Sequence, residues 1–167
     1  MIPVCKSYVE AVLKSIGISA VFTDPDEVSK QKGVKHALLE TDQPLQFTRD
    51  GARLAKTIDS GTGAHIYHRR IYKTAWRMTV YISAKDEAAA NKLTKDFLKN
   101  LQEFITDEDG YGVEVNALTG NLTTEKSVMR SSAVYDILME FTGGVYRADT
   151  VPLLPEVAPE GEIVQEV

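Results

Sequence analysis

The stretch AHIYHRRIYKTAWRMTVYISA, residues 64–84, decides the fold, because it continues without glycine or proline and alternates in its second half. Apolar and polar side chains there fall on opposite sides of an extended chain. One side carries Tyr72, Trp76, Met78, Val80 and Ile82, and the other carries Lys73, Arg77, Thr79, Tyr81 and Ser83. This period of two predicts a β-strand with one face in the core.

The segment is longer than an ordinary strand. We therefore expect it to bend, or its first half to project with residues 52–58 as a long hairpin. DSGTG at 59–63 is typical of a glycine-containing hairpin turn. Further upstream, residues 36–58 are strand-like but interrupted at Gln43 and Pro44. Proline cannot donate to a sheet ladder, so Pro44 marks an edge or a break.

Apolar residues at helical spacing predict two amphipathic helices. The first covers about 4–16 and ends at Gly17, with its apolar face formed by Val9, Val12, Leu13 and Ile16. The second covers about 85–105, with Ala90, Leu93, Phe97, Leu101 and Phe104 on one face. Ser83 and Asp86 resemble the residue pair that begins a helix.

The remaining segments are shorter or more polar. In the first half of the chain we predict a strand at 18–24 that ends in a Pro-Asp turn, followed by a loop at 26–35. In the second half we predict a short strand at 112–118 and a polar connection at 119–127. A last strand at 130–141 ends at Gly143 and Gly144, with 145–150 as its continuation. This order predicts an α+β fold: an antiparallel β-sheet with a long β-hairpin and two main helices packed on one face. We expect residues 1–150 to form one domain and residues 151–167 to form a flexible or partner-ordered tail rich in proline and glutamate.

Composition limits the possible partners. The net charge is −5 and the pI is near 5.2, which argues against strong non-specific binding to nucleic acid. Cys5 is the single cysteine, so no intrachain disulfide forms, and this fits a reducing compartment. The first residues, MIPVCKSYVEAVLKSIG, lack the basic region and the uninterrupted apolar stretch typical of a leader, and the sequence contains no apolar run of membrane-spanning length. We therefore expect a soluble protein of the cytoplasm that does not bind a membrane.

The first half of the long strand, HIYHRRIYK at 65–73, contains the residues that most suggest chemistry. In a strand, His65 and His68 point to opposite faces and cannot hold one metal ion together. His68 and Arg70 share one side, and Arg69, Lys73 and Arg77 line the other. A charged exposed strand is favoured, and an electrostatic contact surface stays open as the alternative.

Sequence motifs for known chemistry are absent. The sequence lacks the common nucleotide-binding, hydrolase, metalloprotease and calcium-loop patterns. Asp107, Glu108 and Asp109 could attract a divalent cation, although a solvated acidic turn is favoured. Tyr67 and Tyr72 interleave with arginines in a way that could stack on bases, but the acidic composition disfavours it. We therefore predict no catalytic residue, cofactor or metal site, and no specific binding of nucleic acid.

Four features, in their order along the chain, carry a resemblance to a known family. They are the first helix ending at Gly17, the long hairpin around DSGTG, the strand and helix of RMTVYISAKDEAAANKLTKDFLKNLQEF, and the closing SAVYDILMEFTGGVYR. This order resembles the tail terminator proteins of long-tailed bacteriophages and prophages, also called tail completion or minor tail protein U-like proteins. The resemblance covers about residues 1–148 at the level of pattern.

The resemblance implies a structural protein and not an enzyme. Proteins of this kind form a six-membered ring on the end of the tail tube, stop its polymerisation and present a surface to the head–tail connector. The implied partners are copies of the chain, the tail tube protein and the connector protein, in the virion and in the cytoplasm of the bacterial host. A head-to-tail ring needs two different complementary patches on each copy. The basic candidates are Arg69, Arg70, Lys73 and Arg77, and the acidic candidates are Asp86, Glu87 and the glutamates of the tail.

Two other classes of function stay open. A small-molecule-binding or regulatory α+β module would use a pocket between sheet and helices, lined by residues such as Trp76 and Tyr135. An enzyme would need titratable groups that converge and have shifted pKa values.

Overall fold

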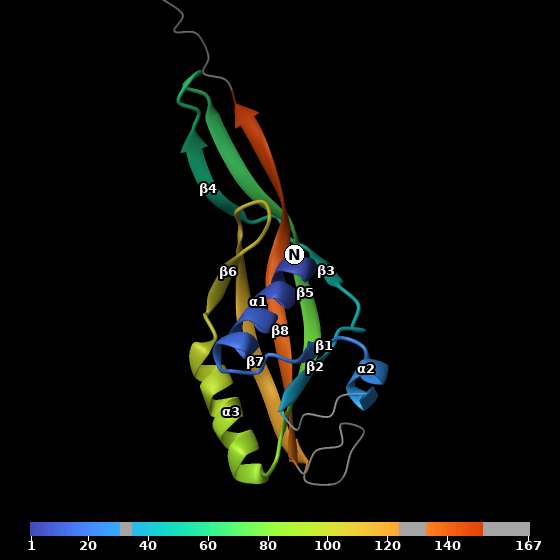
Figure 1. Cartoon of the computed structure of the whole chain (residues 1–167). Helices are drawn as coiled ribbons and strands as arrows, with labels where there is room; N and C mark the ends of the chain where they lie inside the picture. Colours follow the sequence, from blue (N-terminus) through green and yellow to red (C-terminus); the bar gives the residue numbers. More distant parts are fainter. Residues whose placement is uncertain (31–34, 124–132, 152–167) are drawn as a thin grey trace, which may run out of the picture.

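The computed structural model describes residues 1–30, 35–123 and 133–151, apart from the side chains of residues 53 and 54, and shows a mixed α/β protein dominated by strands (Figure 1). Within these ranges the helices are α1 (Ile2–Ser15), α2 (Pro25–Lys30) and α3 (Glu87–Asn100). The strands are β1 (Val21–Phe22), β2 (His36–Glu40), β3 (Gln46–Arg49), β4 (Arg53–Ile58), β5 (His65–Ala84), β6 (Phe104–Thr106), β7 (Gly112–Thr123) and β8 (Ala133–Val151).

The two longest strands, β5 and β8, form the centre of a single sheet. Its order is β1-β2-β5-β8-β7-β6, and β3 and β4 pair with β5 further along the edge that β2 occupies. All of these pairs are antiparallel except β1 with β2, which is parallel. The sheet is therefore mixed, and the prediction of a purely antiparallel sheet is wrong. A parallel pair needs a crossover connection, and α2 lies in the connection between β1 and β2.

The main core confirms the predicted alternation of the long strand. Trp76, Met78, Val80 and Ile82 are at most 1% exposed and pack in one cluster with residues from both long helices. The helical members of this cluster include Cys5, Val9 and Leu13 of α1 and Phe97 of α3. Burial of each large side chain contributes on the order of 1.5–3 kcal/mol. The buried Trp76 indole satisfies its polar atom by donating to the Gln43 carbonyl oxygen at 3.0 Å.

Both predicted long helices are present, but the second is shorter than expected. Leu101 has extended backbone angles (φ −70°, ψ 133°), so α3 ends at Asn100 and residues 104–106 form β6 instead. At the other end, Asp86 is the N-cap, because its side chain accepts a hydrogen bond from the Ala89 amide at 2.8 Å. The predicted pair is therefore only half right, since Ser83 belongs to β5.

The predicted loop at 26–35 begins as a helix, α2. Asp24 accepts a hydrogen bond from the Asp26 amide at 2.9 Å, and Pro25 occupies the first helical position, where a missing N–H costs nothing. Val28 lies on the inner side of α2, where its side chain is only 1% exposed. The preceding strand is correspondingly short, since the predicted 18–24 reduces to Val21–Phe22.

The last two strands extend further than their sequences suggested. β7 continues to Thr123, into the predicted polar connection, and β8 continues through both glycines to Val151. A Cβ on Gly143 would lie 2.9 Å from the Met1 sulfur, and one on Gly144 would lie 2.5 Å from Arg70 Cδ. These glycines therefore permit close packing and do not stop the strand. The predicted tail lies outside the described residues, except for Val151.

Beyond the N-terminus of α1, three strands continue away from the body as an arm (Figure 1). We define the arm as β4, residues 65–70 of β5 and residues 146–151 of β8. The register of β5 against β8 shifts between Arg70 and Tyr72, so Ile71 is an extra residue and forms a β-bulge. Of the two predicted alternatives, the projecting hairpin with residues 52–58 is confirmed, because β4 pairs with the first residues of β5.

Candidate functional site

The bulge at Ile71 changes which basic side chains share a face. Arg70, Lys73 and Arg77 lie opposite Tyr146, Gly144 and Glu140, which alternate along one side of β8. Arg69 lies opposite Arg147, on the other side. The prediction that Arg69, Lys73 and Arg77 line one side is therefore wrong, because an extra residue inverts the alternation beyond it. Arg69 is on the same face of the sheet as Trp76 and Met78, on which α1 packs in the body. Arg70, Lys73 and Arg77 are on the opposite face.

The two histidines behave as an extended strand requires. His65 lies opposite Ile58 and Val151, whereas His68 lies opposite Ala55 and Ala148, so their side chains point to opposite faces. Within the described ranges, no group of three His, Cys, Asp or Glu side chains could hold a metal ion. His68 instead connects the arm to the body, with Nδ1 3.1 Å from the Tyr111 hydroxyl and Nε2 3.2 Å from Thr57 Oγ1.

An ion pair fixes the base of the arm. Arg70 Nε donates to Asp50 Oδ2 at 2.6 Å, and Asp50 Oδ1 accepts from the amides of Gly51 at 2.7 Å and Ala52 at 3.1 Å. The Arg70 guanidinium and the Gly51 amide lower the pKa of Asp50. Arg70 therefore holds the connection between β3 and β4 against β5, and it is not a free surface charge.

Two tyrosines stack beside this ion pair. The rings of Tyr111 and Tyr146 are 3.8 Å apart between centroids, with an interplanar angle of 16°. Burial raises the pKa of Tyr146. Tyr111 belongs to the turn between β6 and β7 and Tyr146 to β8, so this stack joins the body to the arm. No sequence pattern predicts these contacts of Asp50, Tyr111 and Tyr146; only the Asp50-Gly51 pair, typical of a turn, offers a local signal.

Most of the other predicted basic residues are also paired within the chain. Arg77 Nε donates to Glu140 Oε2 at 2.8 Å across the two central strands. Arg147 Nε forms an ion pair with Asp149 Oδ1 at 2.8 Å. Oδ2 of the same carboxylate lies 3.7 Å from Arg69 Nε. Arg69 Nε is enclosed and has no hydrogen-bond partner among the described residues. Lys73 is exposed and makes no ion pair within the described part of the chain.

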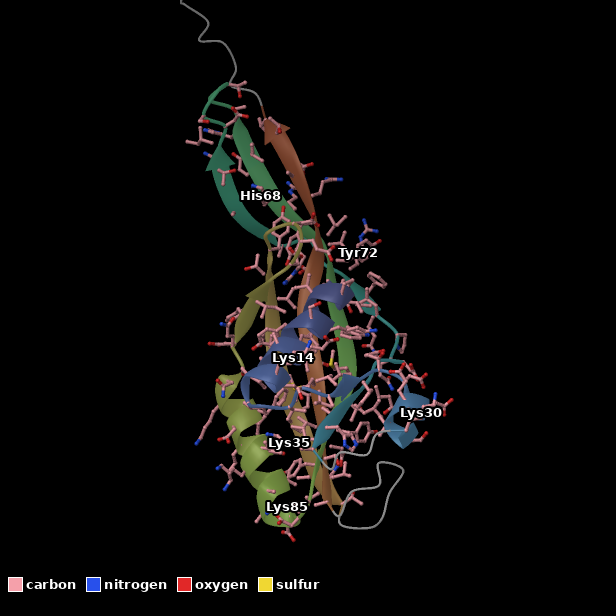
Figure 2. The ribbon with its side chains drawn as sticks, viewed as in Figure 1. Lys14, Lys30, Lys35, His68, Tyr72 and Lys85 are labelled. Atoms are coloured by element: carbon pink, nitrogen blue, oxygen red, sulfur yellow. The ribbon has the colours of Figure 1, made fainter. Side chains whose placement is uncertain are left out.

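The predicted acidic patch lies far from the basic one. Asp86 and Glu87 follow directly after β5, at the end opposite to Arg69, and Figure 2 shows Lys85 and His68 toward opposite ends of the elongated molecule. The separation is about 50 Å at roughly 3.3 Å per strand residue. Part of this acidic patch is already engaged, since Asp86 caps α3 and lies 3.8 Å from Lys85. One chain therefore does not bring the two patches together.

Both long edges of the arm are open within the described chain. β4 pairs with β5 only, and the pairing of β8 with β7 ends at Thr142, so residues 143–151 pair with β5 only. Each edge presents unpaired backbone N–H and C=O groups, which can template pairing with another chain. At the tip, Ile58 and Val151 are 65% and 50% exposed.

An exposed apolar strip lies where the arm joins the body, on the face that carries Arg69. The rings of Phe47 and Tyr72 make an edge contact at 6.4 Å, and Val145 lies directly opposite Tyr72. Their exposed fractions are 58%, 38% and 40%. Figure 2 shows Tyr72 beside the N-terminal end of α1. Clustered exposed apolar residues of this kind mark interaction surfaces.

The pocket suggested by the sequence is not formed by the predicted residues together. Trp76 is 1% exposed and packs on Phe141 in the main core. Tyr135 lines a hollow of about 200 Å³ between α3 and the strands β7 and β8. A larger pocket, of about 390 Å³, lies at α2 and is lined by residues that include Val28, Leu38 and Asp136.

No known family model matches the chain, and no curated protein matches it in sequence. No helix in the described ranges is both long and apolar enough to cross a membrane. The features of the described chain that bear on function are therefore the arm, its base and the pocket at α2.

Proposed function

We propose that this chain is a structural protein of a bacteriophage or prophage tail, which forms a ring that caps the tail tube and joins it to the head connector. The order of elements resembles that of tail terminators. The single observation that carries the proposal is the arm, which is open on both long edges. On this proposal the role is structural rather than catalytic, and the site of action is the virion after assembly in the host cytoplasm.

The two open edges suit a head-to-tail contact. The β4 edge of one copy would pair with the β8 edge of the next, so each copy uses two different surfaces and the contact repeats until a ring closes. β4 and β8 are both antiparallel to β5, so the new pair would be parallel. An arm of few strands with most side chains partly exposed is weakly stable alone, and a neighbour on each edge would stabilise it.

Charge supports a contact between copies at the face that carries Arg69. The arm places Lys56, Arg69 and Arg147 on that face, against a single carboxylate, Asp149. The sequence after Val151 contains glutamates at 156, 160, 162 and 166 and no lysine or arginine. We propose that acidic residues of a neighbouring copy, including these glutamates, neutralise the positive charge on this face of the arm. A small movement of Arg69 toward such a carboxylate would satisfy its enclosed Nε.

The other residues of the predicted basic and acidic patches would not all take part in this contact between copies. Arg70 and Arg77 are engaged within the chain, whereas Lys73 is available beside the arm. Asp86 and Glu87, at the far end of β5, would face the next protein of the stack, either the tube protein or the connector. In this arrangement α1 and α3 cover one face of the sheet. The overall negative charge would repel DNA phosphates in a central channel and so let the genome pass.

Light scattering on size-fractionated protein tests the ring. We expect a species of six copies whose amount rises with concentration, and Arg69→Glu should reduce it while circular dichroism shows an intact fold. Lys95→Glu, an equal charge reversal at an exposed site on α3, is the matched control and should leave the distribution unchanged. Equal oligomer mass in wild type and Arg69→Glu would count against the proposed contact.

A second candidate function is a small-molecule-binding or regulatory module. The observation that favours it is the pocket at α2, which has a volume of about 390 Å³. Pockets that bind small ligands have volumes of about 300–1,000 Å³.

A further inference from the structure

The pocket at α2 has an apolar floor. It lies on the face of the sheet opposite the main core, where Val28, Leu38 and Val134 form a separate cluster with 1%, 8% and 4% exposure. Val28 comes from α2, and the other two come from β2 and β8. Tyr81 of β5 packs against this cluster and also lines the pocket. An aliphatic group placed here would be removed from water on several sides.

Carboxylates from different elements line the same pocket. Glu40 is the last residue of β2, Asp42 follows it, and Asp136 belongs to β8. Leu38, Tyr81 and Asp136 form one row across neighbouring strands, which brings Asp136 beside the apolar floor. The described lining of the pocket contains no lysine, arginine or histidine.

The hydrogen bonds of these carboxylates leave acceptor capacity. The Tyr81 hydroxyl donates to Glu40 Oε2 at 2.8 Å, and Asn121 Nδ2 donates to Asp136 Oδ2 at 3.2 Å. An ionised carboxylate offers about four acceptor positions, so each can accept further donors. Burial, followed by the hydrogen bond and charge of Glu40 and the charge of Asp136, raises the pKa of Tyr81 to about 12. The carboxylates, with no basic side chain in the described lining, give the pocket a negative electrostatic potential.

We propose that this pocket binds an aliphatic primary amine, with the alkyl chain on Val28, Leu38 and Val134 and the ammonium group on the carboxylates of Asp136 and Glu40. Complementarity of charge and of apolar surface selects this class of ligand. The same chemistry is presented by a free alkylamine and by a lysine side chain on another protein. The proposal does not depend on ring formation, because the described residues that line the pocket all belong to one chain.

The experiment is a calorimetric titration of the full chain with n-hexylammonium chloride. 1-Hexanol supplies the same chain without the charge, and ammonium chloride supplies the charge without the chain. We expect hexylammonium to bind about tenfold more tightly than either, since it gains both contributions, and the binding to weaken as salt is added. A lysine-containing peptide is titrated in a separate experiment. Tighter binding of the peptide than of hexylammonium indicates a protein side chain as the natural ligand, and tighter binding of hexylammonium indicates a free amine.

Variants locate the binding. Asp136→Asn keeps the shape and the contact with Asn121 but removes the charge, and it should weaken hexylammonium binding about three- to fivefold. Glu40→Gln is the second variant, in case the first changes the fold. Asp109→Asn removes an equal charge from an exposed turn outside the pocket and should leave affinity unchanged. Absence of hexylammonium binding, equal binding of hexanol, or unchanged affinity in both pocket variants would overturn the proposal.

Discussion

Arg70 and Asp50 form an ion pair of 2.6 Å at the point where the arm leaves the body. The residues are 20 positions apart in sequence, and the pair links the end of β3 to the middle of β5. Asp50 also accepts from the amides that begin the turn into β4. One carboxylate therefore sets both the direction of the turn and its attachment to the long strand.

Replacing Asp50 by Asn should loosen the arm. The pKa of Asp50 is lower in the folded chain than in the unfolded chain. Its contribution to stability is therefore present above the unfolded value of about 3.9 and is lost as the pH falls through the folded value. At pH 7 we expect faster amide exchange in β4 and in residues 65–70 of Asp50→Asn, with the main core unchanged. The difference from wild type should begin to shrink below about pH 4 and should disappear only once the pH is below the folded pKa of Asp50; a difference that stays constant as the pH falls through this range would show that charge is not its cause.

Gly144→Ala should destabilise the chain by about 1–3 kcal/mol, as overpacking does. A Cβ at this position would lie 2.5 Å from Arg70 Cδ and 2.9 Å from Tyr146 Cζ, so the side chain that binds Asp50 must move. Gly112→Ala is the matched control, because a Cβ there meets nothing within 4 Å, and we expect a change within about 0.5 kcal/mol. Urea unfolding measures both. If the two substitutions cost the same, Gly144 does not act through Arg70.

Tyr81→Phe tests the hydrogen bond at the pocket. Below pH 10 the variant should be less stable than wild type by about 1 kcal/mol or less, because it loses the bond to Glu40. The pKa of Tyr81 is raised from 10.0 to about 12, so its contribution is complete below the unfolded value and is lost as the pH rises through the folded value. The advantage of wild type should thus shrink between pH 10 and 12 in denaturant titrations. A constant difference across that range would contradict the assignment.

Engineered cysteines can trap the proposed contact between copies. Ala55 on β4 and Ala148 on β8 are small, exposed and in one row with His68. Within one chain they are two strand spacings apart, about 10 Å, which is too far for a disulfide. Mixing Ala55→Cys with Ala148→Cys should give a mixed dimer under oxidation, and each alone should give little. Burial raises the pKa of native Cys5 to about 12, so that thiol does not compete. If two copies of the same single variant become linked as readily as the mixed pair, the contact between copies is a different one.

The buried parts of the fold could be predicted from the sequence, whereas the arm base could not. The alternation from Trp76 to Ile82 is visible because one face of that strand enters the core. Ile71 carries no comparable signal, since the flanking residues are partly exposed on both faces and a bulge there leaves the pattern polar. The contacts of Arg70 with Asp50 and of Tyr111 with Tyr146 join residues far apart in sequence. Only the register of the strands brings these residues together.

The helix α2 was missed for a different reason. Asp24 and Pro25 suit the end of a strand and the start of a turn, yet in the structure the same two residues are an N-cap and a first helical position. The apolar side chain that would have decided between these readings is Val28, which packs on the face of the sheet away from the main core. The sequence pattern predicts no core on that face, and so it does not indicate the pocket at α2.

Electron microscopy of the purified chain tests the central claim most directly, using wild type at high concentration and the oxidised double variant Ala55→Cys/Ala148→Cys. We predict closed six-fold rings in both samples, with the arms of neighbouring copies side by side. Single elongated particles at every concentration, together with open or irregular chains in the oxidised variant, would contradict ring assembly through the arm.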